Sequence, residues 1–194
     1  MIPEVNDMNN KVVMMMADGV EEIEATVPFD LMWEAGLNVD LVSAQNKSTA
    51  IGANGMVFAN LKNLKGYDFS ANDTLVLPGG AAYQVFLNTP EVLEQVKAFA
   101  QNPQKVLGAI CASASIPGML GLYQGKKYTC VPGLNGDFGG TYENVHSVID
   151  GNLVTGISVG GAFDFAFNLI KVLKGEAEMK KVQENTCWIL PKQK

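Results

Sequence analysis

Val106-Leu107-Gly108-Ala109-Ile110-Cys111-Ala112-Ser113 is the stretch that decides the fold of this chain. Largely apolar residues lead into a lone cysteine, and a helix-like segment, 114–120, follows it directly. This order predicts a buried strand that ends in a tight strand-to-helix turn, with Cys111 at the bend. The turn would place the sulfur near the N–H groups that open the helix, where a thiolate is favoured over a thiol. Alternatively, Cys111 is a small apolar residue packed in the sheet, as free cysteines often are.

Composition limits the classes of protein that fit. The 194 residues are 47% hydrophobic and 18% charged, with a net charge of −6, which predicts a single globular domain over 1–194 with residues 1–10 as a flexible leader. The acidic balance argues against nucleic acid or an anionic membrane as a partner. Three widely separated cysteines indicate neither a disulfide framework nor a metal site. The apolar run 12–17 is too short for a membrane span or a signal peptide, so we expect a cytoplasmic protein.

Apolar runs alternate with helix-like segments along the chain. Strands are expected at 11–17, 38–44, 73–77, 106–110 and 127–132, with a small antiparallel excursion within 45–63 and a hairpin at 146–156. Helices are expected at 26–35, where Thr26 is a candidate cap and Pro28 lies in the first turn, and from Thr89, 114, 162 and 176 onwards. The alternation predicts an α/β sandwich, with helices on a mostly parallel sheet.

Three features follow the ends of expected strands: Glu21-Glu22 with Glu24, Gly79-Gly80, and Cys111. Sites in open α/β sheets form outside the carboxyl ends of the strands, so these features should converge. The glycine pair and the N–H of Ala112 would cradle an oxyanion or an oxidised sulfur. A glutamate beside the thiol would take its proton or, when protonated, donate to the anion. Alternatively, these glutamates are solvated charges favoured by a helix dipole.

Three segments together resemble the DJ-1/PfpI (ThiJ) superfamily, on its DJ-1-like branch. They are Ala17-Asp18-Gly19-Val20-Glu21-Glu22-Ile23-Glu24, Leu75-Val76-Leu77-Pro78-Gly79-Gly80 and Gly108-Ala109-Ile110-Cys111-Ala112. The similarity runs from about Lys11 to Leu173 and includes Phe163-Asp164-Phe165-Ala166.

The resemblance implies a flavodoxin-like α/β/α sandwich, a homodimer and chemistry without a cofactor. It implies that Cys111 is the reactive, oxidisable cysteine and Glu24 the carboxyl that hydrogen-bonds it, with backbone N–H groups from Gly80 and Ala112. The partners it implies are an oxidant or a small carbonyl compound.

The chain departs from the branch at one important position. Members often carry a histidine before a proline on the strand that follows the strand-to-helix turn. Here Val131 stands before Pro132 instead. Without a histidine base, peptide or amide hydrolysis loses its usual proton shuttle, so a protease or amidotransferase is disfavoured. His146 is the single histidine and falls in the predicted hairpin. Cys130 is either a resolving thiol or a packed residue, and Cys187 is expected to pack.

Three functions remain open. The first is a stress-response protein whose Cys111 is oxidised to sulfenic or sulfinic acid. The second is a glyoxalase- or deglycase-type enzyme in which Cys111 adds to a 2-oxoaldehyde and Glu24 moves protons. The third is a chaperone-like binding protein without catalytic activity.

Overall fold

A central seven-stranded sheet organises the computed structural model, which describes residues 10–190. Residues 1–9, most of the predicted leader, lie outside the described part. The strand order is β10-β11-β7-β6-β1-β2-β5. All pairings in this sheet are parallel except that of β10 with β11. The strands are β1 (Lys11–Met16), β2 (Asn38–Ser43), β5 (Lys62–Asn63), β6 (Thr74–Leu77), β7 (Val106–Ile110), β10 (Ser147–Asp150) and β11 (Leu153–Gly156).

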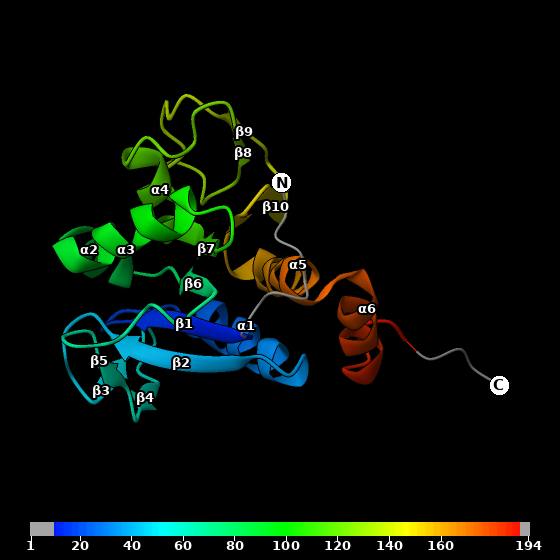
Figure 1. Cartoon of the computed structure of the whole chain (residues 1–194), viewed down its shortest axis with the longest axis horizontal. Coiled ribbons are helices and arrows are strands. Elements are labelled where there is room, and N and C mark those ends of the chain that lie inside the picture. Colours follow the sequence, from blue (N-terminus) through cyan, green and yellow to red (C-terminus); the bar gives the residue numbers. More distant parts are fainter. Residues whose placement is uncertain (1–9, 191–194) are drawn as a thin grey trace.

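Helices cover both faces of this sheet, which makes a three-layer α/β/α sandwich of the flavodoxin type (Figure 1). On one face of the sheet, α1 and α6 both pack against α5. In the other group of helices, α3 contacts α2 and α4 and packs against β6 and β7. The helices are α1 (Glu22–Glu34), α2 (Ala82–Leu87), α3 (Pro90–Gln101), α4 (Ser115–Met119), α5 (Ala162–Lys174) and α6 (Glu176–Asn185). All five residues of β7 are buried, as expected of a strand covered on both faces.

Two small two-stranded sheets complete the fold. β3 (Thr49–Ile51) and β4 (Val57–Ala59) form the predicted antiparallel excursion. β8 (Lys127–Tyr128) pairs with β9 (Thr141–Tyr142), so the strand predicted over 127–132 is much shorter than expected. No helix within residues 10–190 has the length and apolar character needed to cross a membrane.

The first helix differs from its prediction in a way that matters for the site. α1 begins at Glu22 instead of after Thr26, and Pro28 lies inside it. Glutamate is a good helix former, and carboxylates are favoured in the first helical turn, so the acidic run forms helix despite the proline downstream. The early start places Glu22 and Glu24 on a rigid helical turn.

Candidate functional site

Cys111 stands at a sharp bend between β7 and a short 3₁₀ helix, η2 (Cys111–Ala114), which leads into α4. Its φ angle is 61°, in the left-handed region that residues other than glycine rarely adopt. The Ser113 hydroxyl donates to the Pro78 carbonyl at 2.6 Å, which ties the bend to the end of β6. Cys111 is half-buried. The bend therefore places a half-buried cysteine at the carboxyl edge of the sheet, as the sequence predicts.

Glu24 is fully buried, at 0% exposure, in the first turn of α1. The Gly79 N–H donates to its Oε2 at 3.1 Å, and the Cys111 thiol and the Val159 N–H also face the carboxyl. Oε1 has no partner of ordinary hydrogen-bond geometry among the described residues. A Cβ on Gly79 would overlap both the Glu24 carboxyl and the Cys111 Cβ. Only glycine at this position lets the acid and the thiol approach each other.

The electrostatics of this pair follow from burial. Desolvation raises the pKa of Glu24 from its usual 4.5 to about 7, against hydrogen bonds from Cys111, Gly79 and Val159 that lower it. Burial and then the Glu24 charge raise the pKa of Cys111 from 9.0 to about 11. The expectation that the bend favours the thiolate is therefore wrong in direction. The Ala112 N–H does act to lower the Cys111 pKa, but burial and the facing carboxyl outweigh it.

The two groups titrate as a unit. When two acidic groups lie in contact, the first proton lost belongs to the pair, and the charge is distributed between carboxylate with thiol and carboxyl with thiolate. Because the pKa of Glu24 is about 7 and that of Cys111 about 11, the first proton lost comes mainly from the carboxyl, and the thiolate is the minor form at neutral pH.

Gly79, Gly80 and Glu22, the other predicted site residues, each make a different contact near the Cys111–Glu24 pair. The glycine N–H that reaches the Glu24 carboxyl is that of Gly79. Gly80, with φ of 77°, instead forms an antiparallel bridge with Val20 and holds the β1–α1 connection against the end of β6. Its role as a donor to an oxidised sulfur stays a prediction. Glu22 is buried and accepts hydrogen bonds from the Asn54 backbone N–H at 2.6 Å and from its side-chain amide at 2.9 Å, which anchors the β3–β4 hairpin.

The position of the missing histidine does lie beside the bend. The Val131 N–H donates to the Cys111 carbonyl at 3.4 Å. His146 is exposed, with Nδ1 3.1 Å from an Asp164 carboxyl oxygen. Cys130 is buried, whereas Cys187 is exposed, so the expectation that Cys187 is a packed residue is wrong. Among residues 10–190 no group of three or more His, Cys, Asp or Glu side chains gathers as a metal site.

Ser158 is a site residue that the sequence pattern does not single out. It follows β11, and its Oγ lies 3.6 Å from Cys111 Sγ. The signal was present, because a residue just past the end of a parallel strand is a site candidate in this type of sheet.

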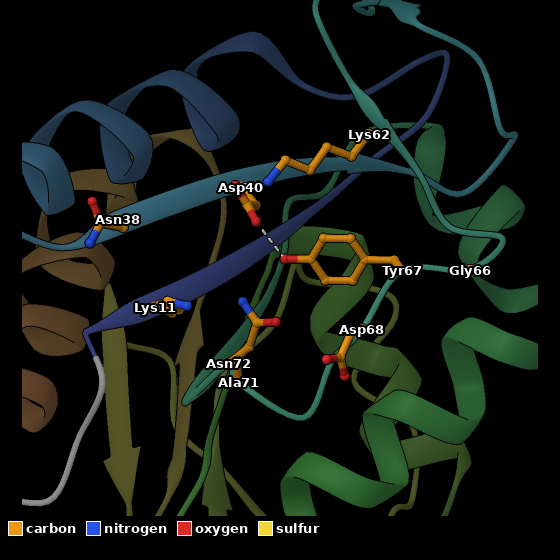
Figure 2. Close-up of a pocket in the computed structure, with 9 residues that line it drawn as sticks. All are labelled: Lys11, Asn38, Asp40, Lys62, Gly66, Tyr67, Asp68, Ala71 and Asn72. Atoms are coloured by element: carbon orange, nitrogen blue, oxygen red, sulfur yellow. Dashed lines mark hydrogen bonds and ion pairs between the residues drawn. The ribbon is translucent and has the colours of Figure 1, made fainter.

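A cavity of about 490 Å³ lies elsewhere, near the amino ends of β1, β2 and β6. Figure 2 shows Lys11, Asp40, Tyr67 and Asn72 around it. Lys62 Nζ lies 2.6 Å from one Asp40 oxygen, and the Tyr67 hydroxyl donates to the other at 2.7 Å. Lys62, Asp40 and Tyr67 are thus paired with one another, and none of the lining residues is a cysteine, so Cys111 stays the candidate site.

The fold and the site define a class: an α/β sandwich with a cysteine at a strand–helix bend, facing a buried carboxyl. The model of the DJ-1/PfpI family matches residues 10–172, and the chain belongs to that family. The glutathione-independent glyoxalase DJ-1 of Schizosaccharomyces pombe is 28% identical over 186 residues, which cover 90% of this chain and 97% of that protein.

Three further comparisons bear on length and on fold. DJ-1 homolog D of Arabidopsis thaliana is 29% identical over 88% of this chain, but the match spans only 49% of the plant protein, and for DJ-1 homolog B it spans 41%. The structure of a cysteine-to-alanine mutant of a DJ-1 superfamily protein from Salmonella typhimurium superposes with a TM-score of 0.85 at 27% identity, covering 91% of this chain and 97% of that one.

Proposed function

We propose that this chain is an oxidisable cysteine protein of oxidative or carbonyl stress, in which Cys111 is converted to sulfenic and then sulfinic acid. One observation carries the proposal: a fully buried glutamate, Glu24, faces and hydrogen-bonds the half-buried Cys111 and has a pKa raised to about 7. A carboxyl whose pKa is about 7 is still protonated in half of the molecules at neutral pH, so it can donate to an anion on the sulfur.

The oxidation can be written from the residues present and a peroxide. The Cys111 thiolate attacks one peroxide oxygen, so that an S–O bond forms and the O–O bond breaks. The leaving hydroxide takes the Glu24 proton and departs as water. A second peroxide repeats the step on the sulfenic acid and gives the sulfinic acid and water. The Ala112 N–H faces the sulfur and would support the anionic product.

The test is mass spectrometry of peptides after mild peroxide treatment. Cys187 is exposed and will react as an ordinary surface thiol, so the experiment uses a Cys187→Ser background. We expect Cys111 to gain two oxygen atoms while the buried Cys130, an internal control, stays reduced. Oxidation of Cys111 no faster than that of Cys130 would refute the proposal.

A second function is supported by the Glu24 pKa and by the relative named a glyoxalase. Cys111 would add to the aldehyde carbon of a 2-oxoaldehyde and form a hemithioacetal. Glu24, with a pKa of about 7, would move the proton from that carbon to its neighbour, and water would release the resulting thioester as a 2-hydroxy acid. Methylglyoxal turnover that is lost in Cys111→Ser would support this function, and no turnover in the wild type would remove it. Suppression of aggregation that survives Cys111→Ser would instead favour the chaperone-like function.

We further propose that the protein is a homodimer and that α1 and the β3–β4 hairpin form its interface. Ile23 on α1 and Ile51, Met56 and Val57 of the hairpin are exposed apolar side chains. Between the two elements lies a cavity of about 230 Å³, lined by Met14, Met16, Ala25, Thr26, Phe29, Leu41, Met56 and Phe58. Exposed apolar surface of this kind is typical of an interface. Analytical ultracentrifugation should find a dimer in the wild type and a monomer in Val57→Asp; a monomeric wild type would contradict the proposal.

The compartment stays a prediction. All three cysteines are free, which fits the reducing cytoplasm.

A further inference from the structure

The segment between β11 and α5 contacts both members of the reactive pair. Ser158 Oγ lies 3.6 Å from Cys111 Sγ, and the N–H of the next residue, Val159, faces the Glu24 carboxyl. β11 pairs in parallel with β7, with Gly156 opposite Ile110. Ser158 therefore follows β11 at the same edge of the sheet at which Cys111 follows β7. The sheet topology itself brings the hydroxyl to the sulfur.

The local backbone holds Ser158 in this place. Its carbonyl accepts a hydrogen bond from the Gly161 N–H at 2.8 Å, which closes the short 3₁₀ helix η3 (Val159–Gly161). Gly161 is buried, and a Cβ there would clash with the His146 carbonyl, so the turn packs closely against the residue before β10. Among the described residues, the Cys111 sulfur is the one hydrogen-bond partner found for the Ser158 hydroxyl.

We propose that the Ser158 hydroxyl donates a hydrogen bond to the Cys111 sulfur and stabilises both its thiolate and its sulfinate, in a site where Val131 stands in place of a histidine. The sulfinate part rests on the proposed function; the thiolate part does not. A donor to the charged form of an acid favours that form.

The electrostatics at Cys111 agree with this role. Burial is the largest influence on the Cys111 pKa and raises it, whereas the Ser158 hydrogen bond lowers it. A serine hydroxyl is too weak a base to take the thiol proton at neutral pH, so proton transfer stays with Glu24. Ser158 thus differs from a partner histidine, because it stabilises the anion without accepting its proton. In the sulfinate it adds a third donor to the Glu24 carboxyl and the Ala112 N–H.

The first test measures the rate of Cys111 alkylation by iodoacetamide against pH, in a Cys187→Ser background. We expect Ser158→Ala to raise the apparent pKa of Cys111 by about half a unit to one unit, which slows alkylation at neutral pH about threefold to tenfold. Ser158→Thr keeps the hydroxyl and should restore most of the rate. Ser48→Ala, which removes an exposed serine hydroxyl before β3, is the matched control and should change nothing.

A folded Ser158→Ala protein with the wild-type pH profile would overturn the proposal, and so would a Ser158→Thr protein as slow as Ser158→Ala. Folding is checked by circular dichroism and by the urea midpoint of each variant.

The second test follows the oxidised sulfur after peroxide treatment. Ser158→Ala should pass from sulfinic to sulfonic acid several-fold faster than the wild type, since the sulfinate has lost a donor. Equal rates would overturn the sulfinate part. Because alkylation needs no oxidant, a wild-type Cys111 that is alkylated as expected but never forms a sulfinate would refute the proposed function and leave the thiolate part standing.

Discussion

A carboxyl lies at each end of the central sheet, and the pKa values of the two are shifted in opposite directions. At the amino end, burial alone would raise the pKa of Asp40, but hydrogen bonds from Lys62 and Tyr67 hold it below its ordinary value. At the carboxyl end, Glu24 receives no cation among the described residues, and burial raises its pKa to about 7. A carboxyl that accepts hydrogen bonds from a cation stays ionised and serves the structure. A carboxyl that is buried beside a thiol is partly protonated near neutral pH and can exchange that proton.

The largest expected effect is on the pH dependence of stability, when Glu24→Gln removes the carboxyl with the raised pKa. A folded pKa above the unfolded one means that the unfolded chain loses its proton first as pH rises. Wild-type stability should therefore fall, relative to Glu24→Gln, between about pH 4.5 and about pH 7, by about 3 kcal/mol, because the pKa rises from 4.5 to about 7. Urea unfolding at both pH values measures the difference.

Glu34→Gln is the matched control, because Glu34 is exposed at the other end of the same helix. It should follow the wild type at every pH. Parallel stability curves for the wild type and Glu24→Gln would show that Glu24 does not retain a proton in the folded state.

A smaller effect is expected when a histidine is introduced at position 131. Val131→His would place an imidazole beside the bend, and its protonated form should lower the apparent pKa of Cys111 by about one unit. Alkylation slightly below neutral pH should accelerate severalfold, whereas Val131→Gln, of similar size but without a charge, should not. If both variants react like the wild type, the side chain at 131 does not reach the sulfur.

The smallest effect is expected at the amino end. Asp40→Asn removes an ion pair whose side chains are 36% and 56% exposed, so the loss of stability should be about 1 kcal/mol or less. Lys62→Met should cost a similar amount, and the double variant little more. The Cys111 alkylation rate should be unchanged in all three, and a changed rate would show that the two ends of the sheet are coupled.

The sequence predicts the layout of the fold well, because buried strands and their order depend on local hydrophobic runs. Cys111 at the bend and the convergence of three strand ends follow from the same pattern. The start of α1 at Glu22 does not, because a proline favours the first turn of a helix, whereas Pro28 lies in the interior of α1. The sequence also misses Ser158 and the direction of the Cys111 pKa, since both depend on distances and burial across segments far apart in the chain.

The pH dependence of Cys111 alkylation in the wild type and in Glu24→Gln tests most directly whether the ionisation of Cys111 is coupled to that of Glu24. A coupled pair predicts two inflections for the wild type, near pH 7 and near pH 11, separated by a low plateau in which the thiolate is the minor form. Glu24→Gln should show a single inflection below the upper one, because the facing charge is gone. A single inflection at the ordinary thiol value in both proteins would contradict the account.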